Sequence, residues 1–344
     1  MGETKSPSAF VYPGSSLWNV SGLHNSLTQS QAPTAEGLSR SRYEDASTAF
    51  HYYSNTVERY TMRVMSNQGD ALNALEGVLS VLRTTMNTEF IHGLPEMFLD
   101  EALLWVLREP HHRRTALSNT KSGIGFPSWS WVGWNTRSNY GAQFSGYIRR
   151  EVEWYLVNKD SMGFKLLPRD DWDPTEPFDP SDHQNIHPRG SPPEAFLKNL
   201  QNRKHLTTQD LSSCSLVCWT SITTFQLLGD LLDLGEDAID WKNHDAFIIS
   251  DLRSQPVGTI FLEKTWSDVI KKQKEFEFML LSRSNTVENM VAVDETIFPT
   301  GEWCFINVML IQRNADTAQR LGVGVVHEIS WVSVAPKPML IRLE

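Results

Sequence analysis

From about residue 45 the apolar residues follow the period of an α-helix. They are spaced by three or four positions, at Phe50, Tyr53, Val57, Tyr60 and Val64. This spacing places them on one face and predicts a helix over 45–65. A second helix is predicted over 70–84, with inward positions at Leu72, Leu75, Val78, Leu79 and Leu82. Glycine inside a helix costs about 1 kcal/mol relative to alanine, so we expect Gly77 to mark a close contact between helices.

A third helix is predicted over 95–108. Pro95 suits the first turn of a helix, and Pro110 would end it. Residues 98–107 are apolar nearly all round, so we expect this helix to require cover on most of its sides. If part of that cover is missing, the uncovered side would offer a surface to a partner. The three predicted helices make up a helical segment at 43–125.

After residue 125 the pattern changes to short apolar runs that are separated by turns. Within these runs apolar residues recur at every second position, as in Phe276, Phe278 and Leu280, which is typical of strands. The runs lie at 214–228, 245–250, 257–262, 276–282, 303–312, 322–334 and 338–343. Many short strands in series predict an antiparallel sandwich or barrel. The fold class is therefore α+β, with the helical segment followed by a β-rich, sandwich-like or barrel-like domain at 126–344.

Smaller features complete this outline. A short helix is expected at 265–274, and Gly322-Val323-Gly324 inside a strand indicates a bulge or tight bend. Residues 1–42 are rich in polar residues without apolar period, which predicts a disordered head. Residues 168–205 hold seven of the 17 prolines and a cluster of acids, which predicts an exposed or disordered insert.

Composition narrows the function classes. The net charge is −10, which argues against nucleic acid, because nucleic-acid binding requires a concentrated basic face. No apolar run of about 18 residues is present, so we expect no membrane span, and without a signal peptide we expect a cytoplasmic protein. The three cysteines are Cys214, Cys218 and Cys304. Their small, odd number fits a reducing compartment, and their spacing predicts buried thiols and no metal site.

The sequence holds no catalytic motif, so we expect neither catalytic residues nor a cofactor. Gly322-x-Gly324 lacks the third glycine of the dinucleotide fingerprint. His327 and Glu328 are adjacent, and adjacent residues of a strand point to opposite faces. Glu151 and Glu153 would share one face, and an outward acidic pair on an edge strand is the favoured interpretation over acid/base catalysis.

Tryptophans gather in one part of the chain. Four of the 12 lie within thirty residues, at Trp105, Trp129, Trp131 and Trp134. Trp129 and Trp131 would share one strand face. The favoured hypothesis is a structural corner that wedges the helices onto the sheet, with Ser128 and Ser130 pointing outward. The alternative is an aromatic platform for a sugar ring or a partner. The basic run 111–114 is expected to be a solvated loop.

The stretch 126–134, Phe-Pro-Ser-Trp-Ser-Trp-Val-Gly-Trp, resembles the region downstream of the core of fungal heterokaryon-incompatibility (HET) domain proteins. Val132 stands where that family often has Ala. Other stretches resemble the same family in the same order, at 57–75, 93–95, 102–105, 277–283, 307–311 and 320–324. The resemblance implies a fungal protein of self/non-self recognition and programmed cell death.

The defining HET domain would be expected before residue 45, and none of its residues can be mapped onto this sequence. We therefore expect a fragment that lacks the effector and acts as a non-enzymatic interaction or regulatory module with a protein partner. The NAD cleavage suspected for the effector domain would require residues that are not seen here. The alternative is a carbohydrate-binding or hydrolytic β-domain that uses its tryptophans with Glu151 and Glu153.

Overall fold

The structure is a computed structural model that describes most of the chain after residue 34. The described residues are 35–65, 67–107, 112–114, 125–140, 147–158, 163–168, 178–188, 190–201, 204–205, 214–231, 244–263, 265–285 and 291–344. The chain divides into two compact units, Met1–Ser41 and Arg42–Glu344. Of the predicted disordered head, residues 1–34 lie outside the described residues, whereas residue 35 already begins helix α1 (Ala35–Thr61). The architecture given below is that of the second unit.

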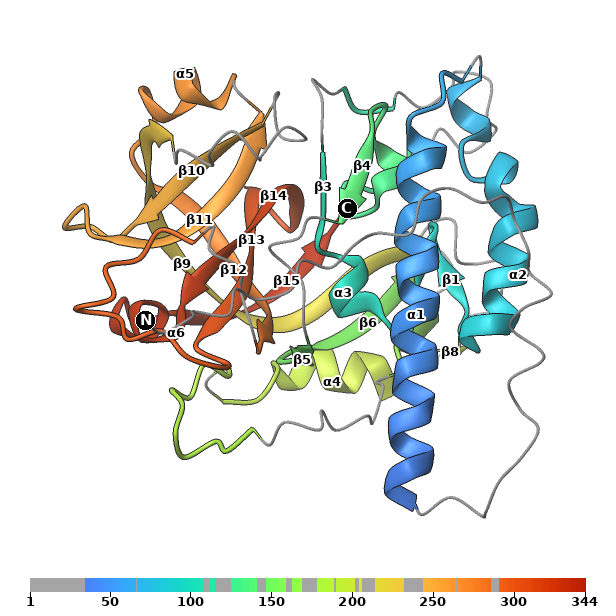
Figure 1. The fold of residues 1–344 in the computed structure, drawn as a ribbon, viewed down its shortest axis with the longest axis horizontal. Helices are drawn as coiled ribbons and strands as arrows, with labels where there is room; N and C mark the ends of the chain where they lie inside the picture. The colour runs from blue at the N-terminus through green and yellow to red at the C-terminus, as the bar shows by residue number, and fades with distance from the viewer. Residues whose placement is uncertain are drawn as a thin grey trace, which may run out of the picture. The chain divides into compact units, whose positions relative to one another are not determined.

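Six antiparallel strands of the second unit close into a barrel (Figure 1). Each strand pairs with the next, and the last pairs again with the first. In order around the barrel they are β9 (Cys214–Leu231), β10 (His244–Ser250), β11 (Pro256–Glu263), β14 (Thr317–His327), β13 (Phe305–Asn314) and β12 (Phe276–Ser284). The predicted barrel-like, antiparallel α+β fold is thus confirmed.

The long strand β9 belongs to the barrel and to the sheet that extends from it. Its second half pairs with β10 and β12, and its first half pairs with β6 (Glu153–Asn158) and β15 (Lys337–Leu343). Shorter strands continue the sheet, namely β5 (Ile148–Arg150) beside β12, and β7 (Gly163–Leu166) and β8 (Lys204–His205) beyond β6. Because β6 has a neighbour on each side, Glu153 does not lie on the edge strand that its pattern suggested.

Alternating side chains of the strands fill two separate cores. In β12 the side chains of Phe276, Phe278 and Leu280 lie in one core, and those of Met279 and Leu281 lie in the other. The first core is the barrel interior. Helix α6 (Glu328–Ser333) contributes the fully buried Trp331 to it. The second core lies between the outer face of the strands and the helical layer, so that the two-residue period of a single strand serves both cores.

The helical layer consists of α1 and α2 (Glu76–Met86), which are joined by the short 3-10 turns η2 (Gln68–Asp70) and η3 (Asn73–Leu75). Of the predicted inward residues, Tyr53, Val57, Leu75, Leu79 and Leu82 are buried. The prediction was wrong for Val64, which is 101% exposed because α1 already ends at Thr61. The expectation for Gly77 was wrong, because it is exposed and no atom of the described residues lies within 4 Å of the position that a Cβ would take.

The predicted helix at 95–108 is not formed. The chain instead makes a hairpin of β1 (Phe90–Ile91) and β2 (Leu94–Pro95), one short turn of helix α3 (Leu99–Ala102), and β3 (Trp105–Leu107), which pairs with β4 (Ser138–Tyr140). An apolar run without periodicity fits buried strands as well as a buried helix. Residues 98–107 are buried apart from the half-buried Glu101, so the required cover is present and this stretch offers no open surface to a partner.

The tryptophan stretch also differs from the predicted strand. Residues 128–130 form a turn, and η4 (Trp131–Gly133) is a single turn of 3-10 helix. Similarly, the apolar run 322–334 is a strand only up to His327 and continues as α6. The predicted short helix near 265–274 is confirmed as α5 (Trp266–Ile270).

The predicted insert 168–205 is only partly exposed. Its described part contains α4 (Glu194–Gln201) and β8. Ile186 in this part is 2% exposed and belongs to the barrel core, so an acidic and proline-rich composition did not prevent local packing.

Among the helices that the structure describes, none pairs sufficient length with the hydrophobicity that a membrane crossing requires.

Candidate functional site

The four tryptophans that the sequence singled out lie close together and are buried. Their exposed fractions are 1% for Trp105, 0% for Trp129, 0% for Trp131 and 7% for Trp134. We call these four residues the tryptophan corner. Rings without exposed faces cannot stack on a sugar, so the geometry matches the structural hypothesis and not the platform.

Hydrogen bonds of the indole nitrogens hold the tryptophan corner together. Trp105 donates to the carbonyl oxygen of Trp129 at 3.0 Å, and Trp134 donates to that of Ser128 at 2.9 Å. Trp131 donates to the hydroxyl of Tyr53 on α1 at 3.1 Å. The indoles therefore connect the helical layer to the segment that precedes β4, in addition to the apolar area that they bury.

The two serines of this stretch do not point outward as predicted. Ser128 and Ser130 are 1% and 0% exposed, because the chain turns here and the alternation of a strand does not apply. The hydroxyl of Ser130 donates to the carbonyl oxygen of His92 at 2.6 Å and accepts from the amide of Val132 at 3.1 Å. The hydroxyl of Ser128 donates to the carbonyl oxygen of Glu344. Both serines thus fasten the corner to distant segments.

A buried arginine completes the corner. The guanidinium of Arg320 on β14 lies 3.5 Å from the ring centroid of Trp105 and donates to the carbonyl oxygens of Leu103, at 2.7 Å, and of Trp105. Burial lowers the pKa of Arg320 to about 9, which leaves the side chain charged at neutral pH. A small pocket lies beside Arg320, and Trp134 and Glu263 also line it.

The basic run 111–114 is not the solvated loop that the sequence suggested, although His111 lies outside the described residues. Arg113 donates to the carbonyl oxygens of Phe126, at 2.6 Å, and Gly133, at 3.2 Å. Its guanidinium also lies 5.0 Å from the ring centroid of Trp134. Arg114 is buried and bonds to the side chain of Gln68. Both arginines therefore contact other residues of the protein at the corner and are not solvated. Burial lowers the pKa of Arg113 to about 10.

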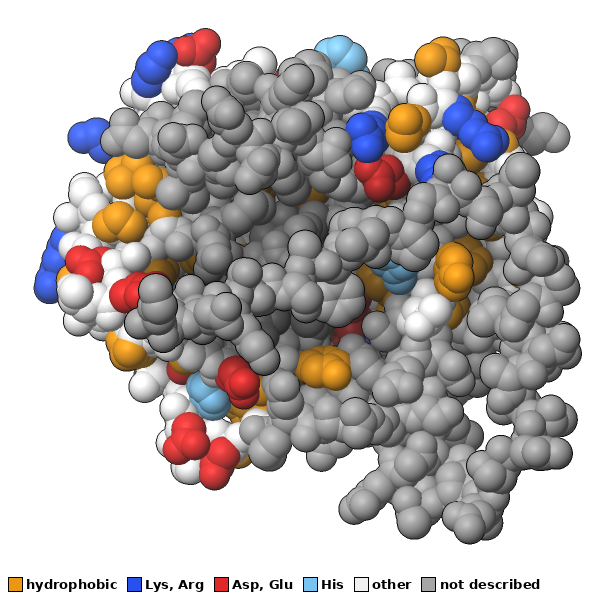
Figure 2. Space-filling view, viewed as in Figure 1, with side chains coloured by type: hydrophobic (Ala, Val, Ile, Leu, Met, Phe, Trp, Pro, Cys, Tyr) orange, Lys and Arg blue, Asp and Glu red, His pale blue; other side chains and the backbone are white. Residues whose placement is uncertain are grey.

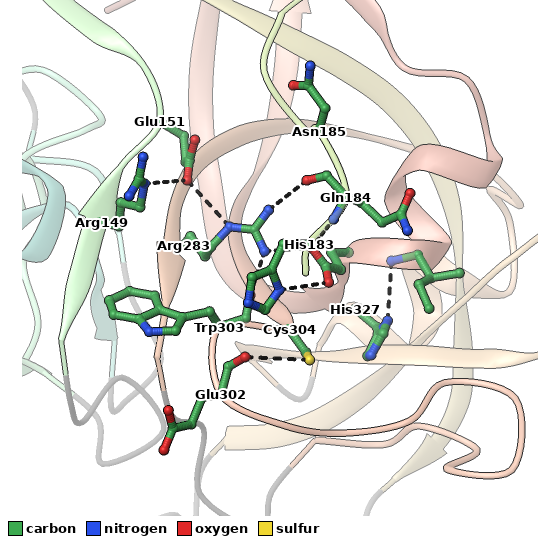
Figure 3. Close-up of polar contacts among 12 residues, drawn as sticks. Arg149, Glu151, His183, Gln184, Asn185, Arg283, Glu302, Trp303, Cys304 and His327 are labelled. Atoms are coloured by element: carbon green, nitrogen blue, oxygen red, sulfur yellow. Dashed lines mark hydrogen bonds and ion pairs between the residues drawn. The ribbon is translucent and has the colours of Figure 1, made fainter. Parts of the chain in front are cut away.

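A second site, which the sequence analysis missed, is built around a buried arginine at the end of β12. Arg283 is 1% exposed. Its Nε lies 3.4 Å from Oε1 of Glu151 (Figure 3). Its Nη1 lies 2.6 Å from Oε2 of Glu328. Its Nη2 donates to the carbonyl oxygen of Gln184 at 3.0 Å. We call this site the buried ion cluster, defined by Arg149, Glu151, His183, Arg283, Cys304 and Glu328.

Glu328 is the centre of the cluster. Its Oε2 accepts from Arg283 and from the amide of Gln184 at 2.9 Å, and its Oε1 lies 3.1 Å from Nδ1 of His183. Its own amide donates to the carbonyl oxygen of Cys304 at 2.9 Å. The start of α6, the start of β13 and the loop at 178–188 therefore meet at one carboxylate. His327, its neighbour in sequence, instead caps α6 by accepting from the amide of Ile329 at 3.2 Å.

Glu151 was expected to be exposed beside Glu153, and this expectation was wrong. Glu151 is 6% exposed, whereas Glu153 is exposed and accepts from the hydroxyl of Tyr155 at 2.7 Å. The two carboxylates therefore do not act as a pair. Burial is the larger influence on Glu151 and raises its pKa, against the opposing effects of His187, Arg283 and Arg149.

The partly exposed side of the cluster carries an imidazole and a thiol. The ring of His183 stacks on Phe178 with centroids 5.0 Å apart. Cys304 is half-buried, unlike Cys214 and Cys218, which are buried in β9 as predicted. Burial, and then the nearby Glu328, raise the pKa of the Cys304 thiol. The residue before it, Trp303, has a positive φ of 62°, a conformation that is costly for a bulky side chain.

The members of the buried ion cluster come from five separate stretches of the chain, so no local spacing could reveal them. One signal was present in the sequence. Arg283 directly follows the apolar run 276–282, and Glu328 is a charged residue inside the run 322–334. A charge placed at the end of a buried strand requires a partner of opposite charge nearby.

Comparison with known proteins adds no relative. No protein-family model matches the chain, and no significant match is found among curated proteins or solved structures. The resemblance to HET proteins therefore depends on the sequence stretches quoted above.

On the face drawn in Figure 2, the described Lys and Arg side chains are interspersed with acidic ones.

Proposed function

We propose that the chain is a non-enzymatic interaction or regulatory module of fungal non-self recognition that acts in the cytoplasm through a protein partner. Two observations support this proposal. The sequence stretches resemble the region downstream of the HET core, and the tryptophans that carry the resemblance are enclosed in packing. All four rings are buried, and the indole nitrogens of Trp105, Trp131 and Trp134 donate hydrogen bonds within the protein, which suits a scaffold better than a reaction centre.

The observation that carries the proposal is the burial of Trp131, which is 0% exposed and bonded to Tyr53. A sugar-binding domain would present such a ring to solvent. The same scaffold displays apolar side chains elsewhere on the helical layer, since Tyr52 is 55% exposed and Met62 is 56% exposed. These side chains are the contacts that a protein partner would cover on this layer.

The test is co-expression in a filamentous fungus with a protein that carries a HET core. We expect the chain alone to leave cells viable and the pair to change the fraction of dying cells that take up a vital dye. Purified chain should bind the HET-core protein in calorimetry. The variant Tyr52→Glu should weaken this binding without lowering the melting temperature, whereas the matched polar change Ser80→Glu on α2 should leave binding unchanged.

Three results would overturn the proposal. One is turnover of NAD by the purified chain, which would make it an enzyme. Another is specific binding on a glycan array that the variant Trp131→Ala loses while its stability is unchanged, which would support the carbohydrate-binding alternative. The third is unaltered viability together with no binding to the HET-core protein, which would remove the link to non-self recognition.

A further inference from the structure

Three side chains with metal-ligating atoms converge on the partly exposed side of the buried ion cluster. The ligand atoms of His183, Cys304 and Glu328 all lie within 4.8 Å of one another. Figure 3 shows His183 and Cys304 on the same side of Arg283. They come from a loop, from the residue before β13 and from the start of α6, so the convergence is a product of the fold.

We propose that His183, Cys304 and Glu328 bind a divalent transition-metal ion of the zinc class. Nitrogen, sulfur and oxygen donors together are the set that such ions favour, whereas Mg²⁺ and Ca²⁺ favour oxygen alone. Three protein ligands leave one position of a tetrahedral ion for water, and the partial exposure of Cys304 gives that position access to solvent.

The distances fit this coordination after a small adjustment. Two ligands each about 2.0–2.1 Å from a tetrahedral zinc ion lie roughly 3.3 Å apart. Nδ1 of His183 and Oε1 of Glu328 are separated by 3.1 Å. The thiol of Cys304 must approach further, because its spacing to the other two reaches at most 4.8 Å and a bound thiolate would lie about 3.5 Å from them. A rotation of the Cys304 side chain supplies a movement of this size.

The surroundings of Glu328 prepare it for this role. Its Oε2 is held by Arg283 at 2.6 Å and by the amide of Gln184 at 2.9 Å. Its Oε1 therefore faces His183, free of the arginine. Outer contacts that orient a ligating carboxylate are a regular feature of metal sites. Arg283 also lies against Glu151, so its positive charge is balanced by a second carboxylate.

The thiol supplies the charge that a metal requires. Burial and Glu328 raise the pKa of Cys304, so without a metal the sulfur keeps its proton and is a poor nucleophile. Metal binding forms the bond between the metal and sulfur and releases the thiol proton to solvent. No electrons are transferred in this step. The proposal is independent of the proposed function.

The test is a titration of the purified full chain with Co²⁺, whose bond to a thiolate gives a charge-transfer absorption band. We expect saturation at one equivalent and loss of the band when Zn²⁺ is added. The variant Cys304→Ser should abolish the band, and His183→Gln should weaken Co²⁺ binding at least about tenfold. Two matched controls, His187→Gln from the same loop and Cys214→Ser from β9, should behave as the unaltered chain.

The outcome that overturns the proposal is a chain that shows no band, or a band that survives Cys304→Ser. Equal loss in His187→Gln would also overturn it, because that imidazole faces Glu151 and not the proposed ligands. Circular dichroism of every variant establishes whether it is folded. If Cys304→Ser does not fold, His183→Gln decides the question, since it changes a side chain in a surface loop.

Discussion

The indole nitrogen of Trp131 donates a hydrogen bond to the hydroxyl of Tyr53 across 3.1 Å, and that hydroxyl donates in turn to the carbonyl oxygen of Gly93 at 2.8 Å. Both side chains are 0% exposed. The hydroxyl of Tyr140 on β4 also lies 3.2 Å from this oxygen, so four segments of the chain meet at one phenolic oxygen. Gly93 is required there, because its φ is +82° and a Cβ would lie 2.7 Å from the Trp131 ring.

Replacing Tyr53 with Phe should destabilise the chain by about 1–3 kcal/mol, because a buried donor and a buried acceptor would each lose their partner. The measurement is the free energy of unfolding from urea denaturation. Tyr52→Phe is the matched control on the same helix, and its ring is 55% exposed, so it should change stability by less than about 0.5 kcal/mol. Equal effects of the two variants would show that the shared hydroxyl does not brace the corner.

Much of the β-domain could be predicted from the sequence because its strands alternate. Phe276, Phe278 and Leu280 face the barrel interior, and Met279 and Leu281 face the other core. The run at 95–108 could not be assigned in the same way. It is buried on all sides, so its residues carry no period that separates strand from helix. Burial was predictable there, and the type of secondary structure was not.

Of the two candidate sites, the sequence predicted one and missed the other. The tryptophan corner could be found because its members are clustered in sequence. The contacts that enclose it, such as Arg320 over Trp105, depend on pairing across more than two hundred residues. Glu151, Arg283 and Glu328 of the buried ion cluster are far apart in sequence and meet only in the folded protein. No local sequence pattern predicts that they come together.

Two glycines should respond in opposite directions to substitution by alanine. Gly324→Ala should destabilise the chain, because a Cβ would lie 2.6 Å from the carbonyl oxygen of Thr259 and the seam between β14 and β11 would have to open. Gly77→Ala should stabilise it by about 0.5–1 kcal/mol, since the position is helical and open. Thermal unfolding of both variants measures the effect. A stable Gly324→Ala variant would contradict the close approach of the two strands.

Replacing Arg283 with Met should cost about 3–5 kcal/mol, because Glu151 and Glu328 would stay buried without their shared cation. Urea denaturation measures the loss. Arg313→Met is the matched control on the neighbouring strand, where the side chain is 40% exposed and pairs with Glu277, and it should cost less than about 1 kcal/mol. Adding Glu151→Gln and Glu328→Gln to Arg283→Met should restore part of the stability. If it does not, the cost arises from lost packing and not from uncompensated charge.

The raised pKa of Glu151 predicts the direction of a pH dependence. Between the ordinary value of 4.5 and the raised value, the folded chain keeps a proton that the unfolded chain has released. The free energy of unfolding therefore falls as the pH rises through this window. We compare the unaltered chain with Glu151→Gln, which has no such proton. The difference between their free energies of unfolding should favour the unaltered chain most below pH 4.5 and should shrink as the pH rises.

Urea denaturation of both chains across a series of pH values measures this difference. Both should carry His187→Gln, because the imidazole of His187 lies 3.1 Å from Oε2 of Glu151 and its own titration would otherwise overlap. The remaining charged neighbours, Arg149 and Arg283, keep their charge throughout. A growing advantage of the unaltered chain with rising pH would reverse the conclusion. It would mean that attraction to the two arginines outweighs burial, so that the folded chain holds Glu151 as a stabilised carboxylate.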